Sequence, residues 1–243
     1  DMPAPVMPDS LVYCQGASGV VNVSGATSYS WSPQTNITPV SGPQVTINTQ
    51  TNQYYYCDFS NACGTVRDSI FVEINIANIL AGNDTIICPG EIASVFASGG
   101  VSYTWSPSPY GLLQPNGAVV LVKPGIPTTY VVVGVDQYGC SDTASVRVDL
   151  FPLPFVQTNP DVYAIFGEEV QLNAVSNTAI SYVWSPAEYL SCNVCQNPVT
   201  EPNKPMIFTV IVYDINGCSA SDIVRIYYDA IIYVPNTFTP NHN

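Results

Sequence analysis

Three copies of one hexapeptide divide this chain. SYSWSP, SYTWSP and SYVWSP occupy residues 28–33, 102–107 and 181–186. Each holds one of the chain's three tryptophans, Trp31, Trp105 and Trp184, which recur at intervals of about 75 residues. A period of that size is typical of a tandem array of small domains, each with its tryptophan at the same core position. We therefore expect the function to lie in the array and not in one central site.

Short β-branched runs separated by Gly, Pro and Asn predict an all-β fold. The second repeat is the clearest, with strands expected at 79–87, 92–97, around Trp105, and at 118–122, 128–135 and 143–150. No segment has the pattern of a useful helix. We expect three β-sandwich modules in a rod, at residues 1–76, 77–152 and 153–229, followed by the start of a further domain at 230–243.

A tryptophan on the third strand that faces a two-sheet core is typical of immunoglobulin-like (Ig-like) sandwiches. The repeats resemble the polycystic-kidney-disease-type Ig-like modules of bacterial surface proteins. They have Trp-Ser-Pro where that family has a Trp-Asp-Phe-Gly-Asp-Gly run, so the resemblance is to the architecture. We expect all three tryptophans to pack in the core instead of stacking on sugars.

The charge balance excludes two classes of partner. Five Lys and Arg stand against eighteen Asp and Glu, a net charge of −13. Nucleic acids and anionic membranes need clustered basic residues. No apolar run approaches the eighteen or so residues of a membrane helix. We expect no nucleic-acid binding and no direct membrane insertion. The N-terminal residues lack the pattern of a signal peptide, which suggests a mature or excised fragment.

The eight cysteines indicate disulfides and not metal ligands. The one histidine, His242, argues against a mixed Cys and His zinc site, and no paired CxxC spacing occurs. We expect no metal and no other cofactor. Disulfides imply an oxidising compartment outside the cytoplasm. Cys192-x-x-Cys195 lies in an expected loop without a thioredoxin-like βαβ context, so we interpret it as a loop clip.

Two pairing schemes fit the other cysteines. Cys14 and Cys88 lie in the turn after a first strand, while Cys63, Cys140 and Cys218 lie in the turn before a last strand. Pairing within modules would join Cys14 to Cys63 and Cys88 to Cys140, but would strand two cysteines. In Ig-like sandwiches these turns lie at opposite ends, and the lower end of one module meets the upper end of the next. We favour pairing across junctions with two local bonds: Cys14–Cys140, Cys88–Cys218, Cys57–Cys63 and Cys192–Cys195.

The sequence offers no catalytic constellation. The only histidine is near the end of the chain, which removes Ser-His-Asp and Cys-His arrangements. No glycine-rich phosphate loop follows a strand. Asp214-x-Asn216-Gly217 resembles the start of a calcium loop but lacks the downstream bidentate Glu, and turn formation explains it better. We therefore expect no enzyme activity, no catalytic residue and no metal ligand.

A short motif, Asp followed by Ser or Thr and then an apolar or small residue, occurs four times. It resembles the O-glycosylation signal of exported Bacteroidota proteins. Most copies also fall where strands begin, which explains a Ser or Thr equally well, so both interpretations stay open. The candidate acceptors are Ser10, Ser69, Thr85 and Thr143.

The last residues carry the most specific resemblance. They resemble the opening of the gliding-motility-associated C-terminal domain, the type B sorting domain of type IX secretion cargo. That domain continues well beyond the point where this chain stops, so we expect an incomplete copy. The matching residues are Tyr233, Val234, Pro235, Asn236, Phe238, Thr239, Pro240 and Asn241.

The resemblance implies a secreted protein on the surface of a gliding-type bacterium of the Bacteroidota. Its partners would be the type IX translocon and an outer-membrane anchoring protein, with an extracellular glycan or other surface ligand held by upstream domains. We expect the modules to form the stalk of an adhesin. One alternative is a spacer or carbohydrate-binding accessory region of a secreted hydrolase, which a row of exposed aromatics would favour. Tyr54, Tyr55 and Tyr56 are the candidates, although strand alternation must bury some of them. A self-associating surface fibre subunit is the other alternative, because unpaired edge strands permit it.

Overall fold

The computed structural model describes residues 1–228 apart from 108–110, 166 and 202. Throughout that part the regular structure is β-strand, except for one 3₁₀ turn, η1 (Ala187–Tyr189). None of its helical segments is long and apolar enough to cross a bilayer. The described residues form two compact units, residues 1–85 with 92–148, and residues 86–91 with 149–228.

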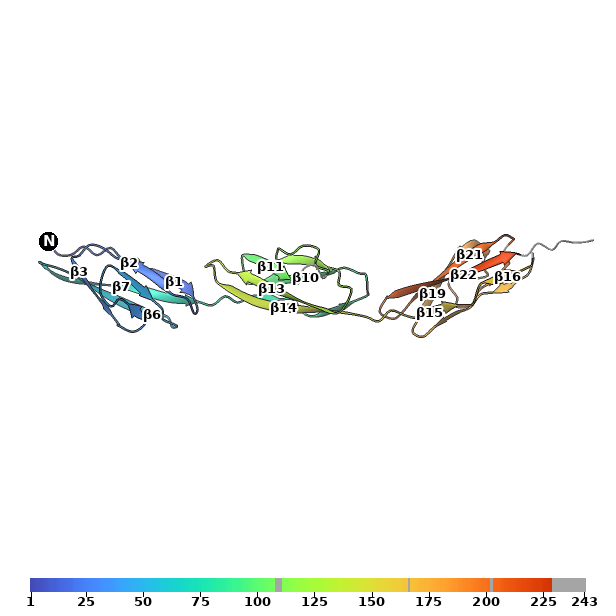
Figure 1. Ribbon diagram of the computed structural model, residues 1–243, viewed down its shortest axis with the longest axis horizontal. Coiled ribbons are helices and arrows are strands. Elements are labelled where there is room, and N and C mark those ends of the chain that lie inside the picture. The colour runs from blue at the N-terminus through green and yellow to red at the C-terminus, as the bar shows by residue number, and fades with distance from the viewer. Residues whose placement is uncertain (108–110, 166, 202, 229–243) are drawn as a thin grey trace, which may run out of the picture. The chain divides into compact units, whose positions relative to one another are not determined.

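The first sandwich has two sheets (Figure 1, blue). Its strands are β1 (Ser10–Cys14), β2 (Gly19–Asn22), β3 (Ser28–Ser32), β4 (Ile37–Thr38), β5 (Gln44–Ile47), β6 (Gln53–Asn61) and β7 (Gly64–Asn75). One sheet has the order β1-β7-β6-β3 and the other β2-β5-β4. Only β1 and β7 pair in parallel. The third, sixth and seventh strands share one sheet and the second, fourth and fifth share the other, as in Ig-like sandwiches.

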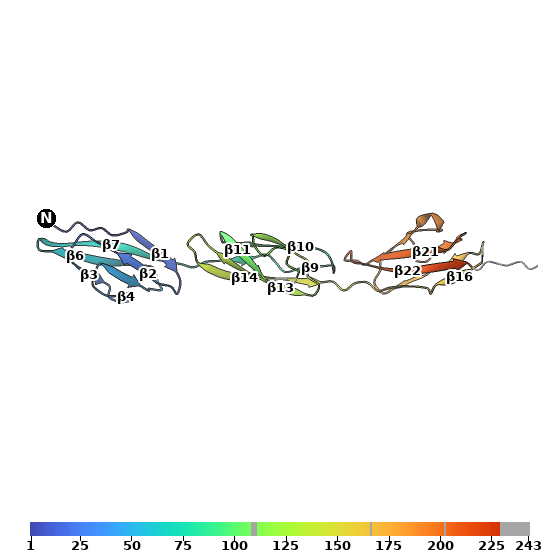
Figure 2. The same ribbon diagram turned by 45° about the horizontal axis from the view of Figure 1, so that its top comes forward.

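The second sandwich repeats this order (Figures 1 and 2). Its strands are β8 (Leu80–Ala81), β9 (Thr85–Ile87), β10 (Ala93–Ser98), β11 (Ser102–Ser106), β12 (Val119–Val122), β13 (Thr128–Val135) and β14 (Ser141–Leu150). The sheet orders are β11-β13-β14-β9 and β12-β10-β8. Side chains alternate between buried and exposed along β10 and β12, as expected for strands with one face on a core.

The third sandwich follows the same plan within the second unit. Its strands are β15 (Val156–Thr158), β16 (Val162–Ala164), β17 (Val170–Gln171), β18 (Ala174–Ser176), β19 (Ser181–Ser185), β20 (Val199–Thr200), β21 (Met206–Tyr213) and β22 (Ser219–Tyr228). β16-β22-β21-β19 form the larger sheet, opposite the pairs β15-β18 and β17-β20. The prediction of an all-β tandem array of three Ig-like sandwiches is confirmed.

One expected strand, 79–87, is in fact two. β8 pairs with β10, whereas β9 belongs to the other sheet, so the chain changes sheets between them. Gly82 lies at this change, where an added Cβ would come within 2.6 Å of the Phe96 ring. Asp84 then accepts a hydrogen bond from the backbone N–H of Arg147 at 2.7 Å. A side chain at position 82 would therefore displace the exposed Phe96 ring, and the Asp84 carboxylate joins the start of β9 to β14.

The three tryptophans lie in the cores, as expected. Trp31, Trp105 and Trp184 are 1%, 2% and 1% exposed. Burying an indole stabilises the core only if its N–H finds an acceptor. Each indole N–H donates to a backbone carbonyl in the segment that leads to the fifth-strand position: Gly42 O at 3.1 Å, Gly117 O at 3.0 Å and Cys195 O at 3.0 Å.

Replacing Trp31 with alanine should lower the free energy of unfolding of the first sandwich by about 3–5 kcal/mol, because it empties a fully buried site. Tyr54→Ala, on the exposed face of the same sheet, is the control and should cost less than about 1 kcal/mol. Hydrogen exchange of the β6 and β7 amides, followed by mass spectrometry, measures both. Equal loss of protection in the two variants would contradict the core role of Trp31.

Candidate functional site

In the first unit, the turn between β13 and β14 is shaped by one carboxylate. Asp136 Oδ1 accepts hydrogen bonds from the backbone N–H groups of Tyr138 and Cys140, each at 2.9 Å. Asp136 N in turn donates to Cys140 O at 2.8 Å. Gly139 has φ +81°, a left-handed conformation that glycine adopts without strain. These bonds fix the position of Cys140.

The second unit contains the same turn between β21 and β22. Asp214 Oδ1 accepts from the N–H groups of Asn216 and Cys218, each at 2.9 Å, and Gly217 has φ +83°. The resemblance of this segment to a calcium loop is therefore explained by the turn. No cluster of three metal-ligating side chains occurs among the described residues.

Each turn receives a cysteine from a distant strand end. Cys14, at the end of β1 in the first sandwich, is bonded to Cys140 in the second, with Cα atoms 5.3 Å apart. Within the second unit, Cys88 is bonded to Cys218 at the same Cα separation. That distance lies within the range of unstrained disulfides. The structure thus forms the two long-range bonds that the sequence favoured, and not the alternative Cys14–Cys63 and Cys88–Cys140 bonds.

The Cys192–Cys195 bond clips the loop between β19 and β20. This loop supplies two acceptors to the tryptophan of the third sandwich. Asn193 O accepts from Trp184 N at 2.8 Å, and Cys195 O accepts from the indole N–H. The clip therefore has a structural role, since it shapes the loop that satisfies a buried indole.

The predicted Cys57–Cys63 bond is absent from the structure, in which both residues carry free thiols. Cys57 is fully buried in the middle of β6, and Cys63 is exposed in the following turn. Four strand residues, about 13 Å at 3.3 Å each, separate Cys57 from that turn. A disulfide spans at most about 7 Å between Cα atoms. Cys57 lies directly opposite Trp31 in the sheet, as Val132 and Val210 lie opposite the tryptophans of the other two sandwiches. Cys57 therefore acts as a small core residue.

Hydrogen bonds accompany the Cys14–Cys140 bond at the junction. Asn75, the last residue of β7, donates from its side-chain amide to Asp136 Oδ2. Ile79 N donates to Asp142 Oδ2 at 3.1 Å. Desolvation works to raise the pKa of Asp136, but the hydrogen bonds from Asn75, Cys140 and Tyr138 outweigh it and lower that pKa below its ordinary value. The carboxylate therefore stays ionised at neutral pH.

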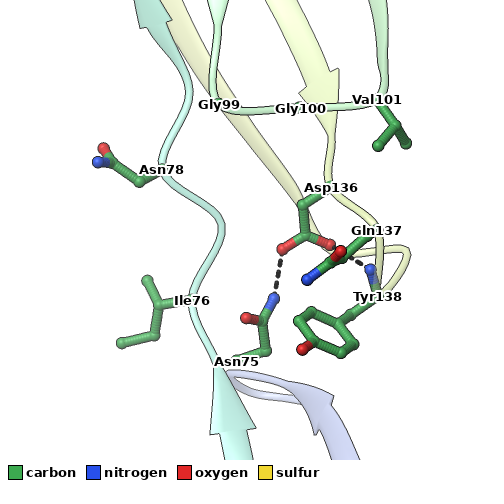
Figure 3. Close-up of a pocket in the computed structure, with 9 residues that line it drawn as sticks. All are labelled: Asn75, Ile76, Asn78, Gly99, Gly100, Val101, Asp136, Gln137 and Tyr138. Atoms are coloured by element: carbon green, nitrogen blue, oxygen red, sulfur yellow. Dashed lines mark hydrogen bonds between the residues drawn. The ribbon is translucent and has the colours of Figure 1, made fainter.

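A cavity of about 340 Å³ opens beside these bonds, within the size range of small-ligand pockets. Figure 3 shows the Asn75 amide pointing toward Asp136, whereas the Ile76 and Asn78 side chains point away from it. Both Asp136 oxygens already accept hydrogen bonds. The nine lining residues include no His, Cys, Ser or Lys, so this lining pairs no nucleophile with a base: Asn75, Ile76, Asn78, Gly99, Gly100, Val101, Asp136, Gln137 and Tyr138.

The structure places the candidate glycosylation residues on strands. Ser10, Thr85 and Thr143 are exposed, and Ser69 is half-buried. In two copies of the motif the aspartate has a structural task, since Asp84 accepts from Arg147 N and Asp142 accepts from Ile79 N. Glycosylation of the four residues stays a prediction. The sorting-domain motif at 233–241 lies outside the described residues.

Strand alternation separates the three consecutive tyrosines. Tyr55 is fully buried and donates its hydroxyl hydrogen to Thr35 O at 3.0 Å. Tyr54 and Tyr56 point to the opposite face and are 53% and 40% exposed. Phe71 lies directly opposite Tyr54 on β7, with ring centroids 5.0 Å apart. Sequence reasoning missed Phe71, because its place depends on the register between β6 and β7.

No family model and no curated protein matches this chain. Several solved structures are similar. The titin fragment I67–I69 has 13% identity and a TM-score of 0.41, over 95% of this chain and 100% of that one. The titin tandem I9–I11 has 11% identity and a TM-score of 0.45, over 93% and 99%. The eight N-terminal Ig domains of DSCAM have 13% identity and a TM-score of 0.37, over 93% and 37%. These low values carry nothing about function, and the Ig-like assignment rests on the strand order.

Alkylation of the native chain with iodoacetamide at pH 8 should label Cys63 and spare Cys57. Burial raises the pKa of the Cys57 thiol to about 11, so the reactive thiolate is scarce below that pH, and the side chain is also inaccessible. Mass spectrometry before and after unfolding measures the labelling. If neither cysteine were labelled in the unfolded, unreduced chain, the Cys57–Cys63 bond would exist after all, and the assignment of free thiols would be wrong.

Replacing Cys14 and Cys140 together with alanine should lower the free energy of unfolding of the first unit by about 2–4 kcal/mol, because the bond closes a long loop. Cys192→Ala with Cys195→Ala is the control, since its bond spans a sequence separation of 3 against 126. Urea unfolding followed by tryptophan fluorescence reports both. A larger loss for the short-range pair would contradict this account of the junction.

Proposed function

We propose that this chain is the non-enzymatic stalk region of a secreted cell-surface adhesin of a gliding-type bacterium, exported by the type IX secretion system. Support for this route comes from the tail, where residues 233–241 carry the opening pattern of the type B sorting domain. Through that domain the protein would engage the translocon and then an outer-membrane anchoring protein. Its place would be extracellular, on the bacterial surface.

The observation that carries the stalk role is the Cys14–Cys140 bond between the first two sandwiches. A stalk must keep its modules joined under load and must survive proteases. A covalent bond across the junction transmits force from one sandwich to the next even if the intervening linker is strained or cut. Disulfides persist only in oxidising compartments, which fits a surface location. The small number of Lys and Arg residues also leaves few sites for trypsin-like proteases.

The export route is tested with the intact gene in its own host. Antibody raised against residues 1–228 should label whole wild-type cells. In a mutant that lacks the type IX translocon, the surface label should fall to background and the protein should accumulate in the periplasm.

The control is a periplasmic protein exported only by the general secretory pathway, whose amount should not change. Undiminished surface label in the translocon mutant would overturn the proposed route. A catalytic domain encoded in the same gene would instead favour a spacer in a hydrolase.

A further inference from the structure

The outer face of the β1-β7-β6-β3 sheet carries a group of three aromatic side chains, two exposed and one half-buried. Tyr54, Tyr56 and Phe71, with Asp58 and Arg67 beside them, form what we call the tyrosine face. All five residues point away from the core, because their neighbours Tyr55, Cys57, Ile70 and Val72 are fully buried. This face therefore owes nothing to packing of the sandwich interior.

The rings form a small platform. The Tyr54 and Tyr56 rings stack at 26° with centroids 6.4 Å apart, and the centroid of the Phe71 ring lies 5.0 Å from that of Tyr54. The Arg67 guanidinium sits 6.0 Å from the centre of the Tyr56 ring. Rigid aromatic side chains offer large contact areas at a low entropy cost. Such a surface suits a ligand that presents flat C–H faces to the rings.

The charges on this face cancel. Arg67 Nε and Nη2 donate to the two carboxylate oxygens of Asp58 at 2.7 and 2.8 Å. Hydrogen bonding from Arg67 lowers the pKa of Asp58, so the pair stays ionised and mutually neutralised at neutral pH. The five residues of the tyrosine face thus hold no unpaired charge, while the exposed carboxylate of Glu73, two residues beyond Phe71 on the same side of β7, disfavours an anionic ligand. Its complement is an uncharged molecule.

Hydroxyl groups flank the rings. Ser69 and Ser32 lie directly opposite Tyr56 on its two neighbouring strands, and Ser10 lies opposite Phe71. Residues directly opposite in a sheet share a face, so these hydroxyls border the platform. Hydroxyl groups beside an apolar platform can exchange hydrogen bonds with the equatorial hydroxyls of a sugar.

Rings stand at the three platform positions in the first sandwich alone, although the third sandwich has a stacked exposed pair of its own, Tyr163 and Tyr227, at other positions of its larger sheet. Register places Thr129, Val131 and Arg147 in the second sandwich where Tyr54, Tyr56 and Phe71 stand in the first. The third sandwich has Ile207, Thr209 and Arg225 at these places. A general requirement of the fold would have put rings at all three. The need to form the fold therefore does not explain why rings stand at these three positions.

We propose that the tyrosine face is a binding site for a neutral polysaccharide. Tyr54, Tyr56 and Phe71 would stack on the C–H faces of successive sugar rings, and the flanking serines would hydrogen-bond their hydroxyls. An aromatic ring carries negative charge on its face and so attracts polarised C–H groups. The proposal stands apart from the export route, because it needs only the first sandwich and no sorting domain.

Affinity gel electrophoresis of the full chain tests the site. The gels contain mixed-linkage β-glucan, galactomannan or dextran as neutral probes, and hyaluronate as the anionic one. At least one neutral polymer should retard the chain, and isothermal titration should show a Kd that changes less than about twofold between low and moderate salt. Tyr54→Ala with Tyr56→Ala should weaken binding about tenfold or more, since it removes two of the three rings that stack on the sugar.

Two matched variants separate binding from folding. Tyr54→Phe with Tyr56→Phe keeps the rings and should bind within about threefold of the parent, because stacking does not need the hydroxyls. Tyr138→Ala removes an equally exposed tyrosine of the second sandwich and should leave binding unchanged. No retardation by any neutral polymer, retention of binding in the double alanine variant, binding to hyaluronate alone, or self-association through this face would each overturn the proposal.

Discussion

The hydrogen-bonded turn before the last strand determines where the long-range disulfides can form. In that turn an aspartate carboxylate holds two backbone N–H groups, one of them the N–H of the cysteine, and a left-handed glycine precedes the cysteine. Cys140 and Cys218 are thereby presented in the same way and meet their partners at the same Cα separation. The first sandwich has Asn61 at the start of a shorter turn, in which Cys63 remains exposed with a free thiol. Formation of the long-range disulfide therefore depends on the shape of this turn as well as on the presence of the cysteine.

Inward and outward positions follow different rules in this array. The inward positions repeat in all three sandwiches. Each has a tryptophan on β3, β11 or β19, and an aromatic residue lies two positions before the residue opposite that tryptophan on the neighbouring strand. These aromatic residues, Tyr55, Tyr130 and Phe208, are all fully buried. The outward positions of the same strands differ from one sandwich to the next. Packing explains the repeats, since these positions face the core and are fully buried in every sandwich. It does not explain the exposed rings of the first sandwich, which is why we look for recognition there.

The tryptophan period and β-branched runs were enough to predict the three sandwiches, because one buried indole per repeat and strand alternation are strong local signals. Prediction failed where it depended on which residues lie opposite each other on neighbouring strands. The register of β6 with β3 shows that Cys57 occupies a core position held elsewhere by valine, and the register of β6 with β7 brings Phe71 to Tyr54. The change of sheet between β8 and β9 was also not predicted, since it depends on which strands the two halves pair with, β10 for β8 and β14 for β9. The long-range disulfides could be anticipated because the turns that carry them recur along the chain.

The most direct test of this account is to determine which cysteines are joined by disulfides. Free thiols are first blocked with excess alkylating agent while the unreduced chain is unfolded. The chain is then digested with pepsin at acid pH to prevent exchange, and linked peptides are identified by mass spectrometry without reduction. The structure predicts linked peptides that contain Cys14 with Cys140 and Cys88 with Cys218, and blocked thiols at Cys57 and Cys63. Peptides that link Cys14 to Cys63 and Cys88 to Cys140 would contradict the account, because each sandwich would then close on itself and the junctions would carry no covalent bond beyond the chain.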